Sequence, residues 1–128
     1  MKLEKDLVKQ VKNSLSVLKM MGDIEWFSRL NSGKVQTKYG SWIQMCDVDT
    51  PDFIAILRDK DKSLCVIFIE CKSDTGSLSN GQVKFKNEYD KKKGFYFLEL
   101  RDIKSLQTFI NDLGYNRLND IEFNLKGN

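Results

Sequence analysis

The sequence of 128 residues contains no histidine, and this absence excludes histidine zinc ligands, Ser-His-Asp triads and histidine general bases. Its three cysteines, Cys46, Cys65 and Cys71, are odd in number and form no Cys-x-x-Cys pair, so they indicate neither a disulfide framework nor a zinc ribbon. Unpaired cysteines are typical of a reducing compartment, which predicts an intracellular, cytoplasmic protein. Any hydrolytic chemistry is therefore expected to depend on carboxylates, lysine, amides and an oxygen-ligated metal.

Long apolar runs are also missing. None reaches the roughly 18 residues that a membrane helix needs, and the first thirteen residues lack the apolar centre of a signal peptide, so no membrane association is expected. Hydrophobic residues make up 41% and charged residues 30%, which favours a packed core in a single domain over residues 1–128. The net charge of +3 is only weakly basic, so nucleic-acid binding would have to come from local clusters of charge.

Hydrophobic periodicity predicts an α/β fold with a central mixed β-sheet flanked by helices. The apolar stripe of residues 2–21 indicates a helix, and residues 52–57 and 64–72 are expected to form a hairpin of two strands. Residue 67 and its neighbours are apolar on both faces, which is typical of a central strand covered on both sides. Further elements are expected at 34–39 and 42–45 (two short strands or one interrupted strand), 82–93 (helix), 95–100 (strand), 103–113 (helix between Asp102 and Gly114) and 121–125 (edge strand or ordered arm).

Three polar residues lie where a buried sheet would normally carry apolar ones. Asp52 begins the first strand of the expected hairpin, and Glu70 and Lys72 end the second, on the same face because side chains alternate along a strand. Two carboxylates brought this close repel each other unless a cation lies between them, and Mg²⁺ or Mn²⁺ binds such oxygen ligands. The backbone carbonyl of Cys71 is a further candidate ligand, and Lys72 is a candidate to orient water or to stabilise charge on a phosphate.

These residues also resemble a known motif. Pro51-Asp52, followed 18 residues later by Glu70-Cys71-Lys72, is similar to the PD-(D/E)xK nuclease motif. The loop after it, which runs to Gln82, and an acidic residue in the first helix, Glu4, resemble the VRR-NUC group, which is similar to Holliday-junction resolvases. A polar turn before the first strand of that group is matched loosely by Arg29-Leu30-Asn31-Ser32-Gly33.

The resemblance implies a restriction-endonuclease-like fold and a metal-dependent DNA endonuclease. Asp52 and Glu70 would be metal ligands, Glu4 would complete the metal shell, Lys72 would be catalytic and Gln82 would position water or substrate. Similar nucleases of this size come from phages or prophages and act as dimers on branched DNA such as Holliday junctions, so branched DNA and a homodimer are the partners that the resemblance implies.

Several alternatives remain open from the sequence. Four lysines near the expected site either contact flanking phosphates or form an ordinary solvated face: Lys34, Lys38, Lys84 and Lys86. A second hypothesis is that the chain is a non-catalytic nucleic-acid-binding module, or a phage interaction protein, on the same fold.

Residues 76–81 have P-loop spacing, but Gln82 follows instead of lysine, so no nucleotide cofactor is expected. Four aromatic residues are expected in the core or in a dimer contact rather than as base-stacking platforms: Trp26, Phe27, Tyr39 and Trp42.

Overall fold

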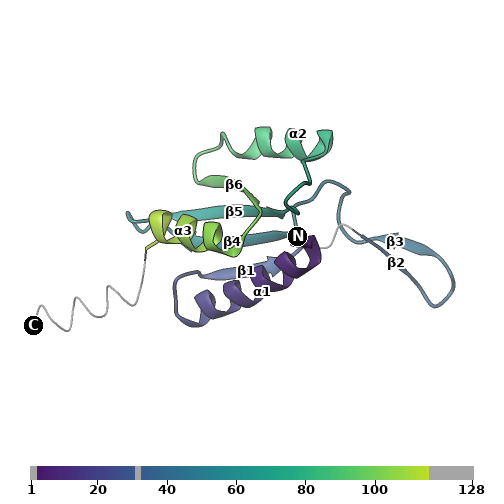
Figure 1. Cartoon of the computed structure of the whole chain (residues 1–128), viewed down its shortest axis with the longest axis horizontal. Coiled ribbons are helices and arrows are strands. Elements are labelled where there is room, and N and C mark those ends of the chain that lie inside the picture. The colour runs from purple at the N-terminus through teal and green to yellow at the C-terminus, as the bar shows by residue number, and fades with distance from the viewer. Residues whose placement is uncertain (1–2, 31–32, 116–128) are drawn as a thin grey trace, which may run out of the picture.

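The computed structural model describes residues 3–30 and 33–115 and contains a mixed four-stranded sheet with helices on both faces (Figure 1). The strand order is β1-β4-β5-β6; β4 is antiparallel to β1 and β5, and β6 is parallel to β5. A separate two-stranded sheet, β2-β3, projects from the body. In chain order the elements are α1 (Glu4–Met20), β1 (Trp26–Arg29), β2 (Lys34–Gln36), β3 (Trp42–Gln44), β4 (Phe53–Arg58), β5 (Leu64–Cys71), α2 (Asn80–Tyr89), β6 (Phe95–Leu100) and α3 (Ile103–Leu113). The predicted mixed sheet flanked by helices is confirmed.

One face of the sheet is a dry aliphatic core. Helices α1 and α3 pack there together, and their inward side chains meet every second residue of β4 and β5, as the period of a strand requires. The members are aliphatic apart from one phenylalanine and one cysteine: Leu7, Val11, Leu15, Ile24, Phe53, Ala55, Leu57, Ile67, Ile69, Cys71, Leu100, Leu106 and Ile110. The burial of Cys71 in this cluster confirms that it acts as a small apolar side chain.

The opposite face is aromatic and lies under α2 (Figure 1). The Phe68 ring on β5 contacts the rings of Phe85 and Tyr89 on α2, at centroid distances of 5.0 and 5.3 Å. Phe95 and Phe97 on β6 extend the same ring cluster. These contacts hold α2 above the carboxyl half of β5, with its N-terminus beside Glu70.

The loop-rich region between α1 and β4 differs from the prediction. Strand β1 was not predicted, yet it pairs with β4 along its whole length, from Trp26 opposite Ile56 to Arg29 opposite Phe53. Strands β2 and β3 are shorter than predicted and form their own hairpin rather than joining the main sheet. Their pairing is local, from Lys34 opposite Gln44 to Gln36 opposite Trp42, and alternation along the chain does not encode whether such a hairpin also joins the main sheet.

Helix α2 begins and ends earlier than predicted, at Asn80 and Tyr89 instead of 82 and 93. A capping box sets the start: Ser79 Oγ accepts the N–H of Gln82, and Gln82 Oε1 accepts the N–H of Ser79. Asp102 caps α3 and Gly114 ends it, as predicted. The strand or arm expected at 121–125 lies outside the described residues.

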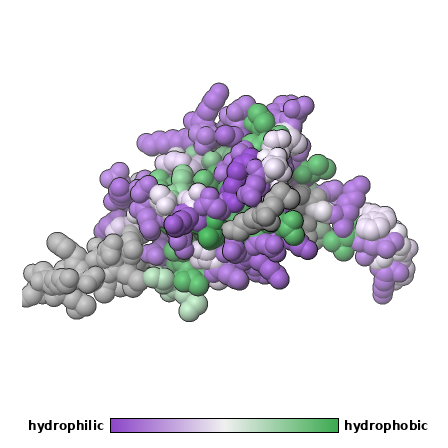
Figure 2. All heavy atoms as spheres, viewed as in Figure 1, coloured by the Kyte–Doolittle hydropathy of each residue, from purple (hydrophilic) through white to green (hydrophobic). Residues whose placement is uncertain are grey.

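The surface is hydrophilic over most of the face in Figure 2, with scattered apolar side chains. Trp26, Tyr39 and Trp42 are 45%, 83% and 64% exposed, so these three lie outside the core, whereas Phe27 packs against it. A dimer contact through the three exposed residues stays a prediction. Among residues 3–30 and 33–115, no helix has both the length and the apolar character needed to span a membrane.

Candidate active site

The polar residues predicted from the sequence meet at one end of β4 and β5. Phe53 lies opposite Ile69 in the antiparallel register, so Asp52, one residue earlier, comes beside Glu70, one residue later. The first turn of α1 brings Glu4 to the same place, near the chain terminus marked N in Figure 1. One carboxylate oxygen from each of Glu4, Asp52 and Glu70 lies within 4.8 Å of the others. The sequence prediction that the hairpin joins Asp52 to Glu70 is confirmed.

Glu70 is the buried member of this cluster. Only 4% of the residue is exposed, and its Oε1 accepts a hydrogen bond from Gln82 Nε2 at 3.1 Å. Its Oε2 is buried and has no hydrogen-bond partner among the described residues. Burial, followed by the charge of Asp52, raises the pKa of Glu70 to about 8, although Lys72 opposes this shift. A carboxylate with a free oxygen in an anionic, buried position is a group that gains from a nearby cation.

Asp52 is held in place by hydrogen bonds to both of its oxygens. Oδ2 accepts the backbone N–H of Cys71 at 2.8 Å, and Oδ1 accepts Arg29 Nη1 at 3.1 Å. The same Arg29 nitrogen donates to the carbonyl oxygens of Leu30 and Asp52, and the guanidinium lies 5.2 Å from the centre of the Phe53 ring. Arg29 therefore fixes the Asp52 carboxylate from the β1 side.

Lys72 and Gln82 both point to the cluster. Lys72 Nζ lies 3.8 Å from Glu70 Oε1, and its side chain is only 12% exposed, so this pair is not the solvated ion pair of an ordinary strand end. Gln82 has two functions at once, because Oε1 caps α2 while Nε2 donates to Glu70. The amide therefore couples the start of α2 to the acidic cluster.

The Cys71 carbonyl faces the same side as Asp52. Its own N–H donates to Asp52, and the N–H and C=O of one strand residue point to the same side, whereas the N–H of Lys72 turns to Leu100 on β6. Three carboxylates and one carbonyl form an all-oxygen donor set of the type that Mg²⁺ and Mn²⁺ accept. The unpartnered Glu70 Oε2 supports the fit of such an ion to this cluster.

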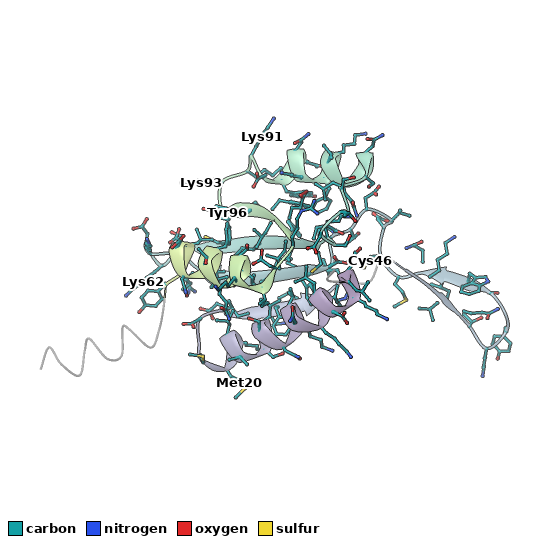
Figure 3. All side chains as sticks on the ribbon, viewed as in Figure 1. Met20, Cys46, Lys62, Lys91, Lys93 and Tyr96 are labelled. Atoms are coloured by element: carbon teal, nitrogen blue, oxygen red, sulfur yellow. The ribbon has the colours of Figure 1, made fainter. Side chains whose placement is uncertain are left out.

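The four predicted DNA-binding lysines lie on two elements, the β2-β3 hairpin and α2. Lys34 and Lys38 are exposed on the β2-β3 hairpin, Lys84 is exposed on α2, and Lys86, four residues after Gln82, is half-buried. None of the hydrogen bonds or ion pairs found within 3–30 and 33–115 joins these lysines to the acidic residues. The three lysines of 91–93 follow the other end of α2, where Gly94 bonds to Val66 near the start of β5 (Figure 3).

Two further residues belong to the site and were missed by the sequence analysis. Arg29 was assigned only to a turn, and its role depends on the β1-β4 pairing. Asp49 Oδ1 accepts Ser79 Oγ at 3.3 Å, and its carboxylate fills the space beside Gly81, so it ties the loop before β4 to the start of α2. No local sequence signal marks either contact.

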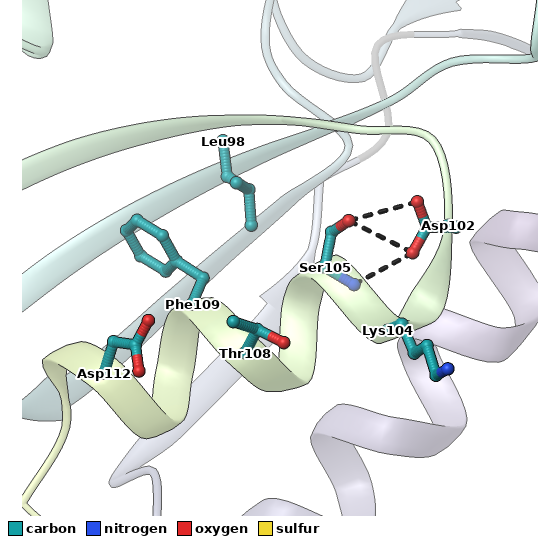
Figure 4. A pocket seen from close by; sticks show the side chains of 7 residues that line it. All are labelled: Leu98, Asp102, Lys104, Ser105, Thr108, Phe109 and Asp112. Carbon is teal, nitrogen blue, oxygen red and sulfur yellow. Dashed lines mark hydrogen bonds between the residues drawn. The ribbon is translucent and has the colours of Figure 1, made fainter.

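A shallow pocket of about 520 Å³ lies along α3, away from these residues (Figure 4). It is lined on one side by Leu98 and Phe109 and on the other by the polar residues of α3 itself, where Ser105 bonds to Asp102. None of Glu4, Asp52, Glu70, Lys72 and Gln82 lines this pocket.

Comparison of the chain with protein-family models, with curated proteins and with solved structures found no match.

Proposed function

We propose that this protein is a Mg²⁺- or Mn²⁺-dependent DNA endonuclease with a restriction-endonuclease-like fold, similar to the VRR-NUC group. One observation carries the proposal: the oxygens of Glu4, Asp52 and Glu70 converge within 4.8 Å, and the buried Glu70 Oε2 lacks a partner within the described residues. A lysine and an amide adjoin the same carboxylate. A metal ion held by these carboxylates, with a lysine beside it, can supply what hydrolysis of a phosphodiester needs without histidine.

Each residue has a distinct role in the proposed reaction. Glu4, Asp52, Glu70 and the Cys71 carbonyl would hold the ion, which when bound lowers the pKa of water and offsets charge on the phosphate. Lys72 would donate to the phosphate oxygens as their charge grows, or orient the attacking water. Arg29 and Gln82 would act as positioning residues, because each hydrogen-bonds to a carboxylate of the cluster. Branched DNA, a homodimer and a cytoplasmic location belong to this proposal as its expected substrate, assembly and setting.

The proposal is tested by separating metal binding from cleavage. Calorimetry with Mn²⁺ and cleavage of a labelled four-way junction are measured for wild type, Glu70→Ala and Lys72→Ala. Glu70→Ala is expected to lose both signals, whereas Lys72→Ala should still bind Mn²⁺ but cleave about 100-fold more slowly. Glu88→Gln, on the exposed side of α2, is the matched control and should behave as wild type.

Two results would contradict the proposal. Cleavage at the wild-type rate by both variants would show that the chemistry occurs elsewhere. Tight DNA binding by the wild type without metal-dependent cleavage of any DNA form would instead favour the non-catalytic binding module.

A further inference from the structure

The β2-β3 hairpin is an ordered arm that projects from the body beside the N-terminus of α1 (Figure 1). We define the arm as residues 33–46. All six strand residues are exposed, although a two-stranded hairpin is marginal without something packed against it. Its turn is well defined: Thr37 N–H bonds to the Ser41 carbonyl at 2.7 Å, Thr37 Oγ1 accepts two backbone N–H groups, and Gly40 has a φ of +85°.

The two faces of the arm differ in character. Gln36 lies opposite Trp42, and Lys34 lies opposite Gln44, so these four residues share one face. Trp42 is 64% exposed there, and at the tip Lys38 Nζ lies 5.1 Å from the centre of the exposed Tyr39 ring. The other face carries three apolar side chains, each about half exposed: Val35, Ile43 and Met45.

The charge and position of the arm indicate its occupant. The arm has two lysines and no acidic residue. The chain enters the arm three positions after Leu30, whose N–H bonds to the Asp52 carbonyl at 2.8 Å. Arg29, just before Leu30, pairs with the Asp52 carboxylate, so the acidic cluster is close in sequence to the start of the arm. A cationic surface with exposed aromatic rings suits a polyanion with flat faces, which is a nucleic-acid strand. The apolar face carries only three side chains. Their combined area is too small for a stable dimer, which buries roughly 800 Å² per partner.

We propose that the arm binds unpaired nucleotides of the DNA next to the cleaved bond, with a base stacked on Trp42 and flanking phosphates on Lys34 and Lys38. This inference rests on the proposed function, because the cluster at the base of the arm is what brings DNA there. It gives the arm a role in substrate choice, since an aromatic platform accepts a base only where the duplex is open. A branch point or a single-stranded flank presents such bases.

The fluorescence of Trp42 can be used to detect a base stacked on its ring. The chain has two tryptophans, so Trp26→Phe leaves Trp42 as the only one. Titration of Trp26→Phe with an oligothymidylate of twelve nucleotides, without divalent metal, is expected to quench its fluorescence. In anisotropy with the same labelled strand, Trp42→Ala is expected to weaken binding about tenfold, as the loss of one stacked base predicts, while Trp42→Phe keeps most of the affinity. Lys34→Ala should lower the salt slope by about one.

Val35→Ala, on the opposite face of the arm, is the matched control and should bind as wild type. Unchanged fluorescence, or wild-type affinity in Trp42→Ala with intact metal-dependent cleavage, would overturn the role of the arm and leave the nuclease proposal standing. Quenching without cleavage of any DNA form would support the arm and contradict the nuclease proposal. A stable dimer that buries Trp42 and is broken by Trp42→Asp would overturn the inference in favour of a second copy of the chain.

Discussion

The two faces of the sheet have opposite properties. The face under α1 and α3 is aliphatic and closed to water, whereas the face under α2 is aromatic, half-buried and carries the charged groups at its end. Both faces are built from the same strand, because alternate residues of β5 point to opposite sides. We infer that the aliphatic face supplies most of the free energy of folding. This surplus allows the aromatic face to hold Glu70, whose burial is destabilising.

Two neighbouring residues of β5 test most directly whether the two faces contribute differently to stability. Ile67 is fully buried in the aliphatic face, and Val66 is half-buried under α2. Ile67→Ala is expected to lower the free energy of unfolding by about 3 kcal/mol, and Val66→Ala by about 1 kcal/mol. Urea denaturation measures both values, and equal losses would contradict the division of labour between the faces.

The second prediction concerns the cost of Glu70. Its pKa in the folded chain is about 8 instead of the usual 4.5. Below about pH 4.5 the carboxyl is protonated in both states, but as the pH rises toward 8 only the unfolded chain loses the proton, so stability falls across this window. Glu70→Gln removes this loss and is expected to stabilise the metal-free protein by roughly 2 kcal/mol at pH 9, with little effect at pH 4.

Mn²⁺ provides the control for that prediction. The ion should raise the melting temperature of the wild type and leave Glu70→Gln unchanged, because binding to the folded state alone stabilises it. If Glu70→Gln instead destabilises the metal-free chain at high pH, Glu70 is satisfied in the fold and its proposed need for a cation is wrong.

The third and smallest effect concerns the contact that joins α2 to the loop before β4. A Cβ on Gly81 would lie 1.9 Å from Asp49 Oδ2, so Gly81→Ala must displace this carboxylate and is expected to destabilise by about 1 kcal/mol. In an Asp49→Ala background the same change should stabilise by about 0.5 kcal/mol, because alanine is the better helix former. A double-mutant cycle in urea measures this change of sign; additive effects would exclude the contact.

The central part of the site could be predicted from the sequence because it depends on local rules. Alternation along β5 puts Glu70 and Lys72 on one face, and a single hairpin brings Asp52 beside them. The position of Arg29 could not be predicted, because β1 has only four residues and is a strand only through its pairing with β4. That pairing brings Arg29 to Asp52, which lies 23 positions later in the sequence. The same holds for Asp49, which reaches α2 across 30 positions.

The arm shows the other limit of sequence reasoning. Its alternating pattern predicts strands correctly, but the same pattern fits an edge of the main sheet equally well. The strands pair with each other across a short turn, and the local pattern does not decide whether the hairpin also joins the main sheet. The aromatic residues of the arm were expected in the core or in a dimer contact, because an aromatic residue in a short strand is normally buried.

The closed base of the arm has an architectural consequence. Met45 N–H bonds to the Gly33 carbonyl at 3.1 Å, so the excursion starts and finishes at one point beside two adjoining strands that are already paired with each other. An insertion whose two ends lie close together places few constraints on the fold that carries it. Transplanting a hairpin of different length or composition between positions 33 and 45 is therefore expected to leave the body folded.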